Sequence, residues 1–179
     1  TRKYVQEHGL DRNNKRISFG TAGLRAEMKP GYPYMNDLTV LQSAQGLAIC
    51  FLNEYPSNED AKKKQKLSVI IGYDHRQAKQ WNLSSRRFAF LSALVFEHAG
   101  IDVTILHGYN PTPLLPFSIM DTTTSSIGIM VTASHNPKQD AGYKVYWTDA
   151  CQIRSPLDTK ITAFIQANLT PWIDYETAL

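Results

Sequence analysis

The fold is decided by the stretch Ile127-Gly128-Ile129-Met130-Val131-Thr132-Ala133-Ser134-His135-Asn136-Pro137-Lys138, in which an apolar run leads directly into a serine loop. The run over residues 127–131 is mostly branched and too short for a helix, so it predicts a buried strand. The Asn136-Pro137 pair then predicts a turn. Open α/β sheets bind their ligands beyond the carboxyl ends of strands. We therefore expect the loop that carries Ser134 to lie at such an edge.

Other strand and helix signals alternate on both sides of this stretch. Branched or alternating apolar runs predict further strands over residues 67–73, 101–106 and 143–147. Helical spacing with caps predicts four helices. They are expected from the N-cap Asp37, from Ser84 or Ser85 to Gly100, over residues 111–120, and from Ser155-Pro156 to Leu169.

This order of elements predicts a three-layer α/β/α sandwich with a mixed, largely parallel sheet. The strand over residues 143–147 follows the strand over residues 127–131 without a helix between them, so these two are expected to pair antiparallel. A chain of 179 residues fits a single domain of this kind.

Composition and charge indicate an ordinary soluble globular protein, with 42% hydrophobic and 20% charged residues. The net charge of +3 is too slight to indicate nucleic-acid binding and suits an anionic small substrate. No apolar run approaches the ~20 residues that span a bilayer, so no membrane partner is expected. Lys62-Lys63-Lys64 and Lys66 predict a solvated loop. Cys50 and Cys151 have neither metal nor disulfide spacing, which fits a reducing, cytoplasmic compartment.

Ser134 is the first candidate for a catalytic residue. The residues of its loop, taken alone, leave several interpretations open. A serine hydrolase with His135 as the base is disfavoured, because the loop has no Gly-x-Ser-x-Gly elbow and triad partners are not sequence neighbours. Ser134 and Asn136 could also be turn formers and nothing more. A second loop, residues 19–25, has glycines that let backbone N–H groups approach an anion. It ends in Arg25, which is suited to bidentate phosphate contact.

Together, Thr-Ala-Ser-His-Asn-Pro at residues 132–137 and Gly-Thr-Ala-Gly-Leu-Arg at residues 20–25 resemble the α-D-phosphohexomutase superfamily. The run Gly-Tyr-Lys-Val-Tyr-Trp at residues 142–147 is similar to its phosphoglucomutase-2/phosphopentomutase branch. The resemblance implies that Ser134 is held as a phosphoserine, which carries about −1.5 to −2 charge. It also implies that the phosphate or substrate is bound by Thr21, Gly23, Arg25, Asn136 and Lys138.

The same resemblance assigns roles to the remaining candidate residues. Lys144 is expected to neutralise charge on the transferring phosphoryl group and to exchange a proton with the sugar hydroxyl. His135 is expected either to share in proton transfer or to orient the loop. Asp74 and Arg76, in a Gly-x-Asp-x-Arg segment, are expected to form a structural ion pair near the site. His8, His98 and His107 have no partner spacing and are expected to be structural.

Family members bind Mg²⁺ through the phosphoserine and an acidic loop of their second domain, and this sequence has no such acidic triplet. The resemblance thus implies an N-terminal lead-in over residues 1–18, the phosphoserine domain (domain I) over residues 19–170, and an exit over residues 171–179 toward a second domain. Ser134 is expected to reach Mg²⁺ through its phosphate, with the other metal ligands outside this chain. The isolated chain is expected to have no mutase turnover.

The function that the resemblance implies is interconversion of a sugar 1-phosphate and 6-phosphate, or of a pentose 1- and 5-phosphate, through a sugar bisphosphate. A glucose-1,6-bisphosphate synthase and a non-catalytic sugar-phosphate-binding paralogue remain alternatives. One departure from the family favours the last of these. Ala141 stands where the family has Asn, and a left-handed backbone there would cost roughly 1–2 kcal/mol.

Overall fold

The computed structural model describes residues 15–56 and 66–174. Five strands form the main sheet in the order β1-β7-β6-β2-β5. Their bounds are β1 Leu24–Glu27, β2 Leu67–Tyr73, β5 Asp102–Ile105, β6 Ser125–Val131 and β7 Asp140–Tyr146. Strands β5, β2 and β6 run parallel, whereas β7 is antiparallel to both β6 and β1. The predicted mixed, largely parallel sheet and its antiparallel pair are therefore confirmed.

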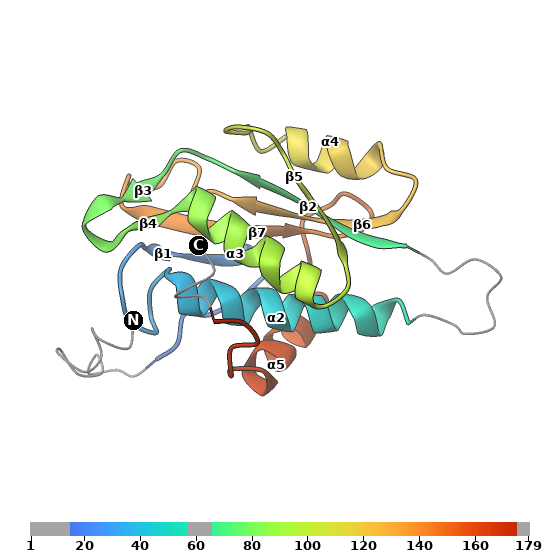
Figure 1. Ribbon diagram of the computed structural model, residues 1–179, viewed down its shortest axis with the longest axis horizontal. Helices are drawn as coiled ribbons and strands as arrows, with labels where there is room; N and C mark the ends of the chain where they lie inside the picture. The colour runs from blue at the N-terminus through green and yellow to red at the C-terminus, as the bar shows by residue number, and fades with distance from the viewer. Residues whose placement is uncertain (1–14, 57–65, 175–179) are drawn as a thin grey trace.

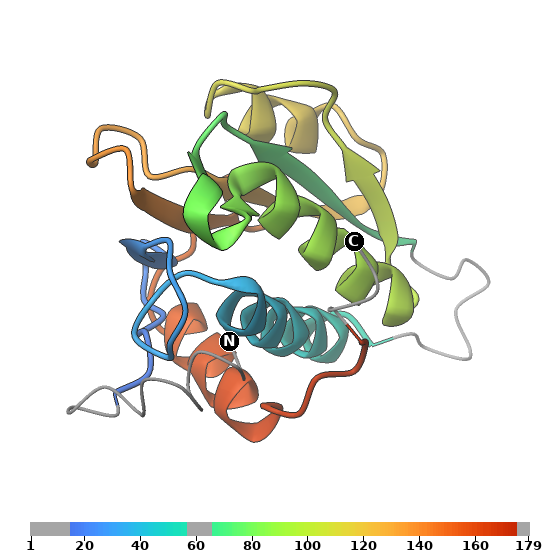
Figure 2. The same ribbon diagram turned by 60° about the vertical axis from the view of Figure 1, so that its left-hand side comes forward.

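Helices cover both faces of this sheet, as the predicted sandwich requires. Helices α2 (Asp37–Glu54), α3 (Ser85–His98) and α5 (Leu157–Ala167) lie side by side on one face, and α4 (Leu114–Met120) lies on the other (Figures 1 and 2). Gly46 lets α2 and α5 approach closely, because a Cβ at this position would lie 2.5 Å from the backbone nitrogen of Ile165.

Alternation along β6 divides the core into two parts. Ile127, Ile129 and Val131 face the three-helix layer and join the main core. Met130 faces the other way and packs with residues of α4 and β2 in a smaller cluster. The strand thus buries both of its faces, which is why it reads as a continuous apolar run.

Two predicted helix starts are wrong by one residue. Asn36, not Asp37, is the N-cap of α2, because it forms a capping box with Thr39 in which each side chain accepts the other's backbone N–H. Helix α5 begins after Pro156, and the hydroxyl of Ser155 makes no capping bond. The N-cap of α3 is Ser84, as predicted, with Arg87 N donating to its Oγ at 3.1 Å.

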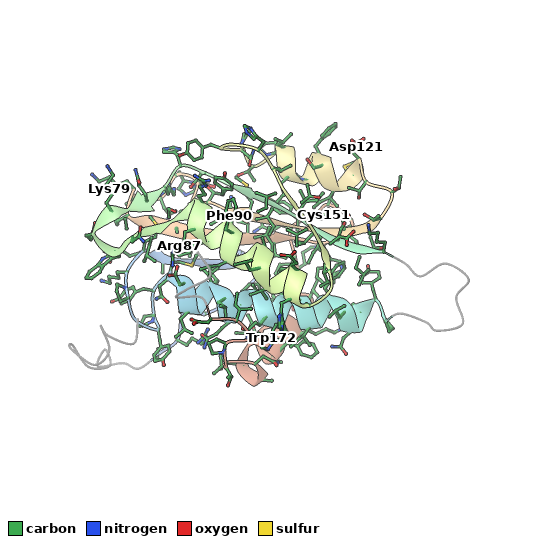
Figure 3. All side chains as sticks on the ribbon, in the orientation of Figure 1. Lys79, Arg87, Phe90, Asp121, Cys151 and Trp172 are labelled. Atoms are coloured by element: carbon green, nitrogen blue, oxygen red, sulfur yellow. The ribbon has the colours of Figure 1, made fainter. Side chains whose placement is uncertain are left out.

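The chain leaves α5 as a strap across α2. Gln42 and Gln45 donate to the carbonyls of Leu169 and Asn168, at 2.6 and 2.9 Å respectively. The ring of Trp172, which is labelled in Figure 3, lies 5.9 Å from that of His98 on α3. These contacts join the segment that follows α5 to both α2 and α3.

Besides β1, three short elements were not predicted. Strands β3 (Gln77–Ala78) and β4 (Leu83–Ser84), joined by the short helix η1 (Lys79–Trp81), form a separate hairpin between β2 and α3. The predicted lysine loop at Lys62-Lys63-Lys64 falls outside the described residues. Within the two described segments, no helix is long and apolar enough to cross a membrane.

Candidate active site

The serine loop, residues 132–139, leaves the carboxyl end of β6 beside the carboxyl end of β2. This is the end of the sheet next to the β3–β4 hairpin, on the left in Figure 1. Asp74, directly after β2, donates its backbone N–H to the carbonyl of Val131 at 3.1 Å. The loop and the Gly-x-Asp-x-Arg segment are therefore tied together where parallel strands place their ligands.

Ser134 has a left-handed backbone, with φ of 53°. Its backbone N–H donates to the hydroxyl of Thr132 at 3.0 Å, and its side chain is exposed. A non-glycine residue in this region is strained unless its surroundings hold it there, and such strain is typical of functional sites. The geometry turns the Ser134 hydroxyl outward at the tip of a fixed loop.

The side chain of Lys144 contacts that of Ser134. It lies on β7 with its side chain on the face opposite Tyr143 and Val145, which join the main core. Lys144 Nζ donates to Ser134 Oγ at 2.7 Å. Burial lowers the pKa of the Lys144 ammonium, and the positive charge of Arg25 lowers it further, while Asp74 acts in the opposite direction. Because its pKa is lowered, the Lys144 ammonium gives up its proton more readily and is better suited to exchange one.

Arg76 holds the serine loop by its backbone. Its Nη1 donates to the carbonyls of Pro137 and Asp140, at 2.7 and 3.0 Å respectively. Its Nη2 donates to the carbonyls of Ser134 and Asn136, at 2.7 and 2.9 Å. Its Nε donates to Asp74 Oδ2 at 3.1 Å, which forms the ion pair. One guanidinium therefore holds four carbonyls around Ser134.

Arg25 reaches the loop from β1. It donates to Asn136 Oδ1 at 3.0 Å, and Asn136 in turn donates to Asp140 Oδ2 at 3.0 Å. The reach depends on Gly23, which has φ of 73° and passes so close to β7 that a Cβ would lie 1.8 Å from the carbonyl oxygen of Tyr143. Close packing against β7 thus requires glycine at position 23, and its contact with a phosphate stays a prediction.

Not every predicted residue contacts the serine. Thr21 is exposed at the tip of the turn between Gly20 and Gly23, where its carbonyl accepts a bond from Gln152 at 3.2 Å. His135 is exposed, and its side chain forms no hydrogen bond with the rest of the described chain. Lys138 is also exposed but lines the cleft beside Ser134. The structure therefore groups Ser134, Lys144 and Arg76 more tightly than it groups the other candidates.

An open cleft of about 670 Å³ lies alongside the serine loop. Besides predicted site residues, it is lined by residues that the sequence did not single out: His75, Gln77, Asn110, Thr112 and Thr132, with two prolines. Of these, Thr132 and His75 stood within motifs that the sequence analysis used, but neither was assigned a role. The others come from the segments that follow β2 and β5, which only the sheet order brings beside Ser134.

Ala141 has the extended backbone of β7 and faces the main core. It is not among the described residues with positive φ, so the strain expected at this departure from the family does not arise. The structure therefore gives Ala141 no part in weakening the presentation of Lys144.

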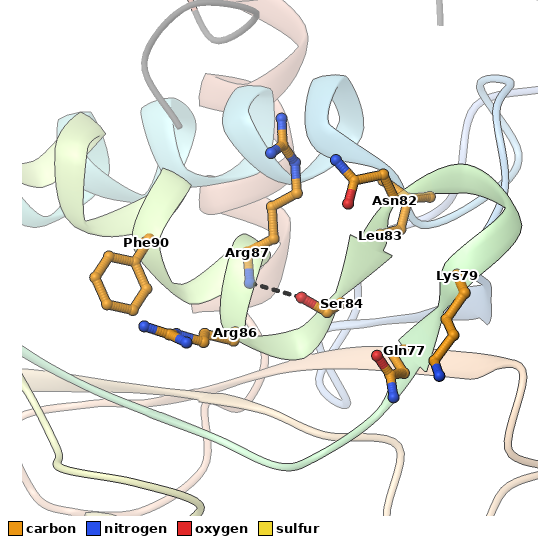
Figure 4. Close-up of a pocket in the computed structure, with 8 residues that line it drawn as sticks. All are labelled: Gln77, Lys79, Asn82, Leu83, Ser84, Arg86, Arg87 and Phe90. Atoms are coloured by element: carbon orange, nitrogen blue, oxygen red, sulfur yellow. Dashed lines mark hydrogen bonds between the residues drawn. The ribbon is translucent and has the colours of Figure 1, made fainter.

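A second groove lies beside the β3–β4 hairpin and shares only Gln77 with the lining of the serine cleft. It is about 410 Å³ and is lined by the hairpin and the first turns of α3 (Figure 4). Arg87 in its wall is paired with Asp37, and Arg86 stacks on Phe90. No candidate site residue lines this groove.

Among residues 15–56 and 66–174, no group of three His, Cys, Asp or Glu side chains could hold a metal ion. Mg²⁺ demands near-octahedral oxygen ligands. The described residues therefore do not form a magnesium site by themselves.

Comparison with known proteins agrees with this geometry. Residues 16–171 match the family described as phosphoglucomutase/phosphomannomutase, alpha/beta/alpha domain I. A putative phosphomannomutase from Thermus thermophilus has a similar solved structure, with a TM-score of 0.68 and 26% identity, over 84% of this chain and 30% of that one.

Three curated relatives are similar to the chain at the level of sequence. A phosphopentomutase from Homo sapiens is 46% identical over 88% of this chain and 24% of its own length. A phosphoribomutase from Saccharomyces cerevisiae is 43% identical over 90% and 24%. A glucose 1,6-bisphosphate synthase from Homo sapiens is 41% identical over 90% and 25%. The chain spans about a quarter of the length of these relatives. The family match over residues 16–171 establishes that this chain belongs to the phosphoglucomutase/phosphomannomutase family, as its α/β/α domain I.

Proposed function

We propose that this chain is the phosphoserine domain of a longer sugar-phosphate mutase, and that Ser134 carries the phosphoryl group. The observation that supports this most directly is the 2.7 Å contact between Lys144 Nζ and Oγ of Ser134, a residue that lines the cleft. In this proposal residues 19–170 are domain I, preceded by a lead-in over residues 1–18. Residues 171–179 lead toward a second domain.

The reaction is a transfer of phosphoryl between two oxygens. The bond from phosphorus to Ser134 Oγ breaks as a bond to a sugar hydroxyl oxygen forms. The hydroxyl loses its proton, and Ser134 Oγ gains one. The resulting bisphosphate then returns its other phosphoryl group to Ser134 Oγ, which restores the phosphoserine. Such a transfer needs positioning and charge neutralisation more than covalent chemistry from the protein.

The named residues have distinct parts in this step. Lys144 donates to Ser134 Oγ as negative charge develops there, and its lowered pKa suits it to pass on a proton. Arg25, which donates a hydrogen bond to Asn136, adds positive charge beside the phosphate. The exposed Lys138 and the turn that carries Thr21 and Gly23 face incoming anions, and the exposed His135 is free to meet the sugar or to steady the loop.

The substrate class follows from the relatives. Their names support a pentose 1- and 5-phosphate or a hexose 1- and 6-phosphate as substrate, with a sugar 1,6-bisphosphate as intermediate or activator. A Mg²⁺ ion bound to the phosphate on Ser134 would take its other ligands from outside the described residues. The remaining domains of the same polypeptide are the expected partners, in the cytoplasm, with no part for nucleic acid or membrane.

A glucose-1,6-bisphosphate synthase is a second candidate, favoured by the 41% identity to a relative of that name. It would use the same phosphoserine but take its phosphoryl group from a different donor. Competition between glucose 1,6-bisphosphate and other phosphoryl donors, measured on the full-length protein, separates the two functions. The non-catalytic paralogue loses its main support, because Ala141 lies unstrained in β7.

Ser134→Ala in the full-length protein tests the proposal. The variant should abolish interconversion of sugar phosphates, because the oxygen that carries the phosphoryl group is missing. Ser118→Ala is the matched control, since among the described residues the Ser118 hydroxyl on α4 bonds only within its own helix, to the carbonyl of Leu114. Normal turnover of Ser134→Ala, measured by coupled assay, would show that another group carries the phosphate.

A further inference from the structure

The hydroxyl of Ser85 is fully buried and points at the site instead of at its own helix. Ser85 is the first residue of α3 and is 0% exposed. Its Oγ donates to Asp74 Oδ1 at 2.6 Å, and its backbone N–H donates to the carbonyl of Arg76 at 3.0 Å. The N-cap of α3 is Ser84, so Ser85 is not needed to cap the helix.

Asp74 is held on both of its oxygens. Oδ1 accepts from Ser85 Oγ and from the backbone N–H of Arg76, the latter at 3.0 Å. Oδ2 accepts from Arg76 Nε at 3.1 Å. The bond from Ser85 therefore sets the rotation of the carboxylate, and the carboxylate sets the plane of the Arg76 guanidinium.

The orientation of that guanidinium fixes the conformation of the serine loop. Both Nη atoms of Arg76 donate to carbonyls of the serine loop, among them that of Ser134 itself, and Nη1 also donates to the carbonyl of Asp140 at the start of β7. A rotation of the guanidinium would break several of these bonds at once. It would also move Ser134, whose left-handed backbone persists only while its surroundings hold it.

We propose that Ser85 is a positioning residue for phosphoryl transfer, acting through Asp74 and Arg76 to fix the serine loop. The proposal rests on the proposed function of Ser134, which it extends by one residue. Ser85 touches neither the reacting atoms nor the cleft, so its effect is on the geometry of transfer and not on substrate binding.

Ser92 provides the contrast. It is also 0% exposed and also lies on α3, but its hydroxyl serves the core, donating to the carbonyl of Phe88 and accepting from Tyr143. If a buried serine hydroxyl on α3 matters only for stability, Ser85→Ala and Ser92→Ala should behave alike. If Ser85 positions the loop, only its loss should slow transfer.

The test uses the full-length protein with Ser134 phosphorylated by glucose 1,6-bisphosphate. The rate of discharge to glucose 1-phosphate is measured in single turnovers, and kcat and KM in the steady state. We expect Ser85→Ala to lower the discharge rate and kcat on the order of tenfold, with KM little changed, because small misplacements of reacting groups are costly. Ser92→Ala should leave both near wild type.

A double-mutant cycle with Arg76→Lys sharpens the result. If Ser85 acts through Arg76, the double variant should be no slower than Arg76→Lys alone, because the coupled residues share one effect. Should Ser85→Ala not fold, Ser85→Cys replaces it with a side chain of similar volume and a weaker donor. Ser85→Cys should still discharge more slowly than Ser92→Ala.

The outcomes separate the two claims. If wild-type Ser134 takes no phosphate, the proposed function fails, and the role of Ser85 fails with it. If wild type is phosphorylated and discharges, but the Ser85 variant discharges as fast as Ser92→Ala, only the positioning role is overturned. Losses that multiply in the cycle would likewise overturn the role of Ser85 and leave that of Ser134 intact.

Discussion

Two Asp–Arg ion pairs in this domain are nearly identical in burial and length, yet they serve different parts of the molecule. Arg76 Nε lies 3.1 Å from Asp74, with side chains 11% and 16% exposed. Arg87 Nε lies 3.0 Å from Asp37, with side chains 19% and 15% exposed. The first pair continues into three bonds to the serine loop and one to the start of β7, whereas the second joins the first turns of α3 and α2.

Both arginines form the same kind of ion pair, so the pair itself does not distinguish them. What distinguishes Arg76 from Arg87 is that its remaining guanidinium donors bind the serine loop. Arg76 shares its segment with Asp74, so the pair is local and leaves its Nη atoms free to reach a distant loop. Arg87 and Asp37 are 50 residues apart, so their pair itself is the long-range link. Substitutions in the two pairs test this division.

The largest effect is expected from Arg76→Ala. The variant leaves three carbonyls of the serine loop and that of Asp140 without their donor, and it frees Ser134 from its strained backbone. Phosphoryl transfer by the full-length protein should fall on the order of a hundredfold or more. Discharge of phosphoserine in single turnovers is the measurement. Arg76→Lys, which keeps the charge but not the fork, should recover little of this loss. Full recovery would show that charge alone matters.

Arg87→Ala should act on stability instead. Its loss leaves the partly buried Asp37 unpaired and uncouples α3 from α2, so the free energy of unfolding should fall by about 2 kcal/mol. Denaturant unfolding measures this. At a temperature where the variant is folded, its transfer rate should match that of wild type, because the pair lies outside the serine cleft. A slowed transfer in folded Arg87→Ala would break the proposed division.

A smaller, pH-dependent effect is expected at Asp37. Burial raises the pKa of this carboxyl, against the opposing effect of Arg87. A raised pKa means that the folded state holds the proton more tightly than the unfolded chain. The stabilisation that comes from the tighter binding of this proton is therefore present at low pH. It is lost as the pH rises through the pKa of Asp37 in the folded state.

Wild type should accordingly gain stability relative to Asp37→Asn as pH falls from about 7 to about 4. Paired unfolding curves at several pH values give the difference directly. If wild type instead loses stability relative to the variant on acidification, the ionised carboxylate is favoured in the fold and the pair with Arg87 outweighs burial.

The sequence predicted the elements that composition, periodicity or capping residues mark locally, and it missed those defined by distant partners. The run over residues 127–131 falls within β6 because its composition alone requires burial. Strand β1 was missed, since four residues at a sheet edge become a strand only by pairing with β7, far along the chain. The N-cap of α2 was placed one residue late because Asn36 and Asp37 are both good caps, and only the bonds with Thr39 distinguish them.

The candidate site shows the same limit. Ser134 and Lys144 could be named because each stands in a motif. The role of Arg76 could be anticipated only as an ion pair, since its other partners are backbone carbonyls that any residue provides. Ser85 carried no signal at all, because its hydroxyl differs from that of Ser92 only in where the fold points it.

The most direct test of the central claim is site-localised mass spectrometry of the full-length protein, before and after glucose 1-phosphate or ribose 1-phosphate is added with Mg²⁺. The account predicts phosphate on Ser134 that leaves when the sugar phosphate is added. A Ser134 that stays unphosphorylated even after exposure to glucose 1,6-bisphosphate would contradict it. The contact between Lys144 and Ser134 would then belong to a binding site and not to a catalyst.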